Sequence, residues 1–179
     1  KINNKIHTIV EGQELTSMPK STALGLLELT TVFENLRPDV VVTIADRYET
    51  IATAIAASYM NIPLAHIQGG EVTGSIDEKV RHAITKLSNF HFASTKLAGK
   101  RIRKMGENPS DIYVTGCPSM DLTMEVVINH KLDFDPIVKY GGVGSEIDLT
   151  GDYIVVLQHP VTTEYDKAGK HVLETLQAV

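Results

Sequence analysis

Charged and polar side chains recur in this sequence directly after short apolar runs, where they could carry out acid–base chemistry. Asp46 follows the run DVVVTI by one alanine, and His66 lies near the end of the run PLAHI. Glu71, Asp77 and Arg81 come shortly afterwards. Removing a proton while an anion departs requires a base, an acid and a cation that receives the anion. These residue types therefore predict an acid–base site, provided that the fold brings them together.

Each of these residues also has a simpler structural interpretation. Asp46 could cap the following helix or pair with Arg47. Asp77 and Arg81 have helical i, i+4 spacing, which is common on solvated, salt-bridged faces. His159 follows the apolar run DYIVVL, and a lone histidine at a strand end is more often structural than catalytic. No single residue is decisive, and the prediction depends on their recurrence at successive strand ends.

Two glycine-containing turns belong to the same pattern. Gly70 ends the segment Gln68-Gly69-Gly70, where paired glycines permit a tight turn or close approach of a ligand to the backbone. Gly116 opens the second turn, and Ser119 in it can cap the next helix. The dinucleotide-binding, phosphate-loop, nucleophile-elbow and zinc-ligand patterns are absent from the sequence. We therefore expect neither a cofactor nor a metal.

Alternating helical and β-branched patterns indicate the scaffold. The expected helices are residues 21–36, 49–60, 76–87, 95–105 and 119–128, and the expected strands are 39–44, 63–67, 90–93 and 111–115. Such alternation predicts an α/β fold with a parallel, doubly wound, Rossmann-like sheet. Ligands of these sheets bind outside the carboxyl ends of the strands, which is where the polar residues fall.

The pattern changes after residue 128. We expect an N-terminal Rossmann-like domain at residues 1–128, a glycine-containing linker at 129–151, and the start of a second Rossmann-like domain at 152–179. In that last part, residues 152–157 read as a strand and 164–179 as a helix. A lone strand–helix unit buries its apolar face only by packing on something else, so most of the second domain is expected to lie outside this sequence.

Composition narrows the class of protein. The 179 residues carry 17 Lys and Arg against 22 Asp and Glu, a formal charge of −5, which argues against a nucleic-acid partner. The single cysteine, Cys117, excludes an intrachain disulfide and fits the cytoplasm. No apolar run approaches the roughly 20 residues of a membrane span, so no membrane partner is expected.

The segment DRYETIATAIAASYMNIPLAHIQGGEVTGSIDEKVRHAITK, residues 46–86, closely resembles hydrolysing UDP-N-acetylglucosamine 2-epimerases of sialic-acid synthesis and their relatives in legionaminic-type pathways. The resemblance continues through TGCPSMD at 115–121 and LQHPVTTE at 157–164. It implies two Rossmann-like domains in a GT-B arrangement, an active site between them, and a homo-oligomer, either a dimer or a tetramer. The implied partner is a UDP-sugar, and the implied reaction releases UDP and N-acetylmannosamine from UDP-N-acetylglucosamine.

Position by position, the resemblance implies a set of site residues. The catalytic candidates are Asp46, Asp77, Glu71 and His159. The substrate-binding candidates are Arg47, His66, Gln68, Gly70, Arg81 and Ser119.

The sequence departs from the family pattern at two positions. Gln68 stands where many members carry a glutamate with an acid–base role, and glutamine cannot transfer a proton at neutral pH. Either Glu71, Asp77 or water then does that work, or the substrate is a relative of the usual one. Ala45 stands where glycine is usual.

Other functions stay open at this point. One is a hydrolysing epimerase for a UDP- or GDP-linked diacetamido sugar, as in legionaminic-type pathways. A non-hydrolysing epimerase fits the GGEVTGxIDExxRHAITK pattern less well. Gln68 also raises the alternative of a noncatalytic nucleotide-sugar-binding module. The simplest alternative is a Rossmann-like domain whose polar strand ends only cap helices.

Overall fold

The computed structural model describes residue 2 and residues 4–12, 15–129, 134–144 and 147–179. Its contacts divide the chain into two units, residues 1–121 and 122–179. We describe each unit by itself. The domain boundaries expected from the sequence stay a prediction.

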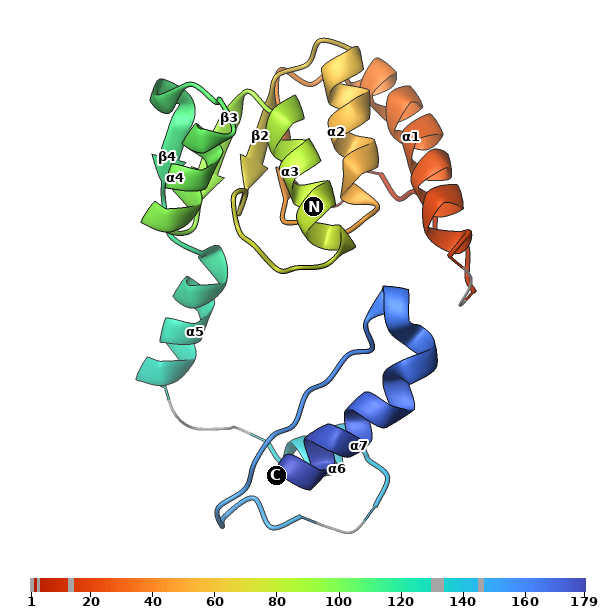
Figure 1. The fold of residues 1–179 in the computed structure, drawn as a ribbon, viewed down its shortest axis with the longest axis vertical. Helices are drawn as coiled ribbons and strands as arrows, with labels where there is room; N and C mark the ends of the chain where they lie inside the picture. Colours follow the sequence, from red (N-terminus) through yellow and green to blue (C-terminus); the bar gives the residue numbers. More distant parts are fainter. Residues whose placement is uncertain (1, 3, 13–14, 130–133, 145–146) are drawn as a thin grey trace. The chain divides into compact units, whose positions relative to one another are not determined.

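The first unit is built on a parallel four-stranded sheet. Its strands are β1 (Val41–Ile44), β2 (Leu64–Ile67), β3 (Phe90–Ala93) and β4 (Ile112–Val114). They lie in the order β1-β2-β3-β4 (Figure 1). The parallel α/β fold expected from the sequence is therefore confirmed. Because the order is sequential, each successive strand of the described sheet lies beside the previous one, always on the same side.

Four α-helices lie entirely within the described part of this unit. They are α1 (Ser17–Leu36), α2 (Thr50–Tyr59), α3 (Ile76–Leu87) and α4 (Lys96–Lys104). Helices α1, α2 and α3 pack side by side, as Figure 1 shows. Helix α3 has the bounds expected from the sequence, whereas α1 begins at Ser17 rather than at the expected Ser21. Helix α1 is capped by Arg37, whose N–H donates the last helical bond to Phe33 O at 2.8 Å; the left-handed backbone of Arg37 and the following Pro38 then end the helix.

Small side chains let α2 pack deep in the first unit. Four alanines of this helix are at most 2% exposed: Ala52, Ala54, Ala56 and Ala57. On the facing helix, a Cβ at Gly25 would lie 3.4 Å from the Cβ of Ala52, so the two backbones approach closely. The core is completed by Phe33, Leu64 and Ile84. The expectation of a buried helix at residues 49–60 is thus confirmed.

The second unit does not contain the strand expected at residues 152–157. That segment has no regular secondary structure, and its apolar side chains are exposed, from 42% at Val156 to 81% at Leu157. A strand needs a neighbour that accepts its backbone hydrogen bonds, and no described residue of this unit provides one.

The regular secondary structure described in the second unit is helical. A 3₁₀ segment η2 (Thr162–Lys167) leads into α7 (Ala168–Ala178), so the single helix expected at 164–179 is divided. The short helix α6 (Pro136–Tyr140) lies within the expected linker, of which residues 130–133 and 145–146 fall outside the described residues. Helix α5 (Pro118–Ile128) spans the boundary between the two units.

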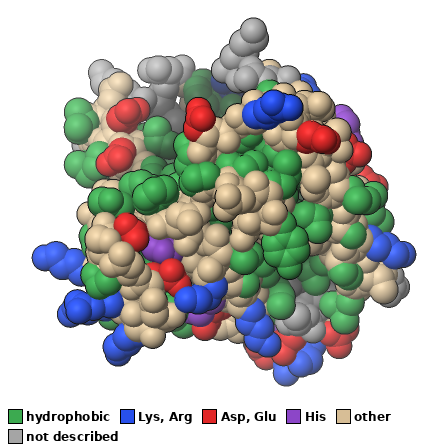
Figure 2. All heavy atoms as spheres, turned by 90° about the horizontal axis from the view of Figure 1, so that it is seen from above, with side chains coloured by type: hydrophobic (Ala, Val, Ile, Leu, Met, Phe, Trp, Pro, Cys, Tyr) green, Lys and Arg blue, Asp and Glu red, His purple; other side chains and the backbone are tan. Residues whose placement is uncertain are grey.

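The surface carries both signs of charge. On the face drawn in Figure 2, Lys and Arg side chains are interspersed with Asp and Glu, and hydrophobic side chains lie between them. Among the described residues, no helix has the length and apolarity that crossing a membrane requires.

Candidate functional site

The turns that follow β1 and β2 begin in the same unusual way. Ala45 and Gln68, the first residues after the two strands, have positive φ angles of 60° and 63°. Their N–H groups still continue the strand ladder, Ala45 to Ile67 O and Gln68 to Phe92 O, each at 2.9 Å. The left-handed backbone then turns the chain away from the sheet, so both loops leave from its carboxyl edge.

An ion pair joins the turn after β1 to helix α3. Asp46, after β1, pairs with Arg81 on α3, whose side chain is only 5% exposed. Arg81 also donates through Nη1 to the backbone carbonyl of Glu71 at 2.8 Å. Burial lowers the pKa of Arg81, yet an arginine stays protonated under all ordinary conditions. A fixed cation therefore holds both the Asp46 carboxylate and the loop that carries Glu71.

This pair replaces the simpler alternatives considered for these residues. Arg81 is buried, so it does not belong to a solvated face shared with Asp77. Arg47 is exposed and pairs with Glu49, not with Asp46. The N-cap residue of α2 is Glu49, so Asp46 does not occupy that position.

Asp77 lies in the first turn of α3, close to the loop after β1. Ser75 caps the helix by accepting from the Asp77 N–H at 3.2 Å, and its hydroxyl donates to Asp77 Oδ2 at 3.1 Å. The positive end of the helix favours a carboxylate there. Glu49 chiefly raises the pKa of Arg47 and Asp77 raises it further, so Asp77 is within electrostatic reach of the residue next to Asp46.

Two glutamates have different roles near the loop between β2 and α3: Glu78 lies on α3 itself, and Glu71 lies on the loop. The Glu78 side chain closes this loop by accepting from the N–H groups of Thr73 at 2.9 Å and Gly74 at 2.7 Å. These bonds, that from Gly74 above all, lower the pKa of Glu78. Glu71 is half-buried, and its backbone carbonyl accepts from Arg81, whereas among the described residues its carboxyl caps no backbone N–H.

Gln68 contacts a residue that the sequence did not single out. Its Nε2 lies 3.0 Å from the Sγ of Cys117, in the turn that follows β4. The backbone N–H of Ser119 chiefly lowers the pKa of Cys117, and Gln68 contributes less to the same effect. The signal in the sequence was the position of this cysteine at a strand end between a glycine and a proline.

His66 is fully buried and bonded on both sides of its ring. Its Nε2 lies 2.9 Å from Ala45 O, and its Nδ1 lies 3.1 Å from Thr85 Oγ1. Burial chiefly lowers the pKa of His66 to about 4, so the ring is neutral at pH 7. No atom of the ring reaches solvent, and Thr85 is a second residue that the sequence did not single out.

Gly70 packs its loop against α4. With φ at 79°, a Cβ at this position would lie 2.4 Å from the carbonyl oxygen of Ala98. The carbonyl of Gly70 in turn accepts from Arg101 Nη1 at 3.3 Å. The close backbone approach expected at this glycine is thus made to another part of the chain.

Two further predicted residues are described separately. Ser119 is exposed at the start of α5, where it contacts Cys117. His159 is exposed in the unit formed by residues 122–179 and is described only within it. In the described ranges, no group of three or more His, Cys, Asp or Glu side chains is arranged to hold a metal ion.

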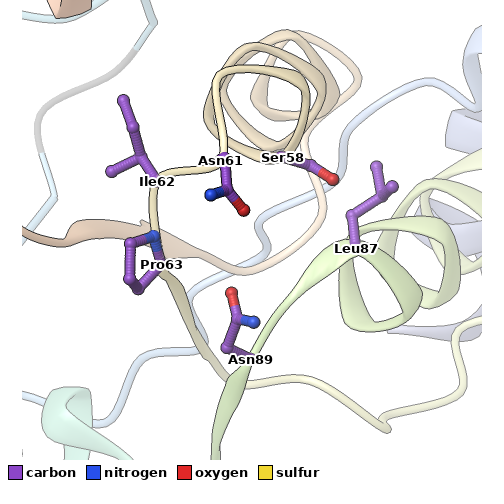
Figure 3. A pocket seen from close by; sticks show the side chains of 6 residues that line it. All are labelled: Ser58, Asn61, Ile62, Pro63, Leu87 and Asn89. Carbon is purple, nitrogen blue, oxygen red and sulfur yellow. The ribbon is translucent and has the colours of Figure 1, made fainter.

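A pocket of about 170 Å³ lies at the opposite edge of the sheet. Figure 3 shows that it opens between α2 and α3, with the side chains of Asn61 and Asn89 pointing into it. Asn89 has a structural task there, because its Oδ1 accepts from the N–H of Leu64 at 2.9 Å. The residues suited to acid–base chemistry lie at the carboxyl ends of the strands, so this pocket is separate from the candidate site.

Comparison with known proteins agrees with this geometry. A family model described as UDP-N-acetylglucosamine 2-epimerase matches residues 1–179. The chain is 38% identical over 169 residues to the hydrolysing UDP-N,N'-diacetylbacillosamine 2-epimerase of Legionella pneumophila, covering 91% of this chain and 41% of that protein. It is 30% identical to the hydrolysing GDP/UDP-N,N'-diacetylbacillosamine 2-epimerase of Campylobacter jejuni, covering 99% of this chain and 44% of that protein.

Solved structures show the same fold. The crystal structure of the Neisseria meningitidis UDP-GlcNAc 2-epimerase bound to UDP-GlcNAc matches with a TM-score of 0.62 and 28% identity, over 70% of this chain and 34% of that one. The chain thus spans less than half the length of these relatives. Because the family model covers all of its residues, the chain belongs to the UDP-N-acetylglucosamine 2-epimerase family.

Proposed function

We propose that this chain forms part of a hydrolysing 2-epimerase that acts on a UDP-linked 2-acetamido sugar. The observation that carries the proposal is the part-buried Asp46–Arg81 pair at the carboxyl edge of the sheet, with Asp77 within electrostatic reach of Arg47. Two carboxylates and a fixed cation in one place are suited to a reaction in which a proton and an anionic diphosphate leave the same sugar.

The reaction balances without a cofactor. A base removes the C2 proton, the C1–O bond breaks, UDP departs with that electron pair, and a C1–C2 double bond forms. Water then adds its oxygen to C1, and a proton is added to C2 on the face opposite to the one from which the first proton was removed. The net change is hydrolysis of the UDP-sugar to UDP and a free sugar with inverted configuration at C2.

The described residues divide these tasks between them. Asp46, held by a guanidinium, is suited to act as a fixed negative charge beside the cationic sugar that forms as UDP leaves. Asp77 and Glu71 are the carboxyls proposed to move protons, since Gln68 cannot. We propose His159 as a further catalytic residue of the full-length protein.

The substrate we favour is a UDP-linked diacetamido sugar. The names of both relatives above, the proteins of Legionella pneumophila and Campylobacter jejuni, specify diacetylbacillosamine. UDP-N-acetylglucosamine, with N-acetylmannosamine as the product, is the second candidate, favoured by the Neisseria structure that binds it. We also propose that the protein is located in the cytoplasm and that it forms a homo-oligomer.

The test is turnover by the full-length protein. Each UDP-sugar is incubated with the protein, and NMR follows free UDP and the released sugar. Asp77→Asn should abolish release, and it breaks no buried ion pair. Asp39→Asn is the matched control, because this exposed aspartate precedes β1 at the other edge of the sheet. Binding of both sugars without UDP release would refute the hydrolytic reaction and favour a noncatalytic sugar-binding protein.

A further inference from the structure

The buried contacts of His66 fix which of its nitrogens carries the hydrogen. The carbonyl of Ala45 can only accept, so the ring must donate to it from Nε2. A neutral ring carries one hydrogen, which leaves Nδ1 bare and able only to accept. The hydroxyl of Thr85 lies 3.1 Å from this bare Nδ1 and 3.1 Å from the Arg81 carbonyl oxygen, so its one hydrogen is shared between these two acceptors. The two residues form one directed chain, Thr85 to His66 to Ala45.

The end of this chain lies at a strained residue. Ala45 has a φ of 60°, a left-handed conformation that costs a residue with a Cβ about 1–2 kcal/mol. Its carbonyl begins the peptide unit that leads into Asp46. The hydrogen bond from His66 Nε2, at 2.9 Å, fixes the orientation of that peptide and hence the direction in which the Asp46 side chain leaves the backbone.

The start of the chain lies on the helix that carries the cation. Thr85 is one turn after Arg81 on α3, and its Oγ1 lies 3.1 Å from the Arg81 carbonyl oxygen. Thr85 and His66 thus connect the backbones of both members of the Asp46–Arg81 pair.

Gly69 packs closely against these two side chains. A Cβ at Gly69 would lie 2.9 Å from His66 Nδ1 and 3.0 Å from Thr85 Oγ1. Both side chains are 0% exposed, so neither can touch a substrate from this position. His91, the partner of His66 in the register of β2 and β3, and His82 on α3 both lower the pKa of His66 and so favour its neutral form.

We propose that His66 and Thr85 are positioning residues that set the Asp46–Arg81 pair in its reactive geometry through the carbonyl of Ala45. The inference rests on the proposed function, because it assigns that pair to the epimerase reaction. It also gives His66 a task that differs from the substrate contact implied by the family resemblance. A displacement of about 1 Å in a reacting group can lower a rate by about 100-fold, so a small loss of order here should be measurable.

The test compares Thr85→Val with Thr85→Ser in the full-length protein. Valine has the shape of threonine without the hydroxyl, whereas serine keeps the donor. We expect Thr85→Val to lower kcat by about 10-fold or more with KM little changed, and Thr85→Ser to recover most of the loss. A merely structural role would lower thermal stability in Thr85→Val and leave kcat per folded molecule unchanged, and that result would overturn the proposal.

A second measurement does not depend on turnover. The ¹⁵N shifts of the His66 ring distinguish a protonated from a bare nitrogen, and we expect Nε2–H with bare Nδ1 in the wild-type protein. A wild-type ring protonated at Nδ1 would overturn the proposal even if the enzyme is active. The expected tautomer without turnover of either UDP-sugar would instead leave the buried chain intact and place the failure in the proposed function.

Discussion

Acidification is expected to destabilise this protein through one buried histidine. His66 is 0% exposed, and burial chiefly lowers its pKa from the ordinary 6.5 to about 4, against an opposing effect of its bond to Ala45. In the unfolded chain the same ring is solvated and has its ordinary pKa. Between these two pKa values, the His66 ring is therefore neutral in the folded state and protonated in the unfolded state.

The sign and size of the effect follow from these two pKa values. Above pH 6.5 the ring is neutral in both states and contributes nothing to the pH dependence. As the pH falls from 6.5 towards 4, only the unfolded state takes up the proton, so the free energy of unfolding decreases. The difference, 6.5 − 4, is about 2.5 pH units, and each is worth about 1.4 kcal/mol, so the full loss is about 3–4 kcal/mol.

Urea denaturation of the full-length protein at a series of pH values in this range measures the loss. The comparison is with His66→Gln, which can still donate to the Ala45 carbonyl but does not titrate. Other titrating groups cancel in the difference between the two proteins, and His7→Gln, at an exposed histidine, is the control. If His66→Gln loses as much stability as the wild-type protein between pH 6.5 and 4, the reasoning is refuted.

Three further predictions concern the loops of the candidate site. Gly70→Ala should reduce the free energy of unfolding by about 2–4 kcal/mol, because the added Cβ would clash with the Ala98 carbonyl oxygen and because the φ of Gly70 is 79°. A midpoint of urea denaturation equal to that of the wild-type protein would contradict this. Iodoacetamide should alkylate Cys117 with a pH midpoint below that of a free cysteine, because the Ser119 N–H chiefly lowers the pKa of the thiol. A pH midpoint equal to that of glutathione would count against the contact between Cys117 and Ser119. Asp46→Asn should cost about 2 kcal/mol of stability by removing the charge that Arg81 pairs with, and Arg81→Met in the same chain should restore part of it. A double variant less stable than Asp46→Asn would show that the charge is not the cause.

The sequence by itself determined the local elements of the first unit. The alternation of β-branched runs and helical patterns is a local property, so all four strands of the sheet were placed and α3 was placed with its bounds. The same local reading failed at residues 152–157, where an apolar β-branched run forms no strand. A strand is completed by a neighbour, and its own residues cannot supply one.

The sequence also predicted that Asp46, Asp77 and Glu71 lie on the segments that follow strands at the carboxyl edge, because parallel strands direct the residues after them to one edge of a sheet. It could not decide which charges pair. Helical spacing offered Asp77 as the partner of Arg81, but the partner is Asp46, 35 positions away in the chain. Nor could it show that His66 bonds to Ala45 and Thr85, since those contacts depend on how α3 packs on the sheet. Residue types and strand ends set the chemistry available to this protein, and tertiary packing alone decided which groups are buried, paired and held in place.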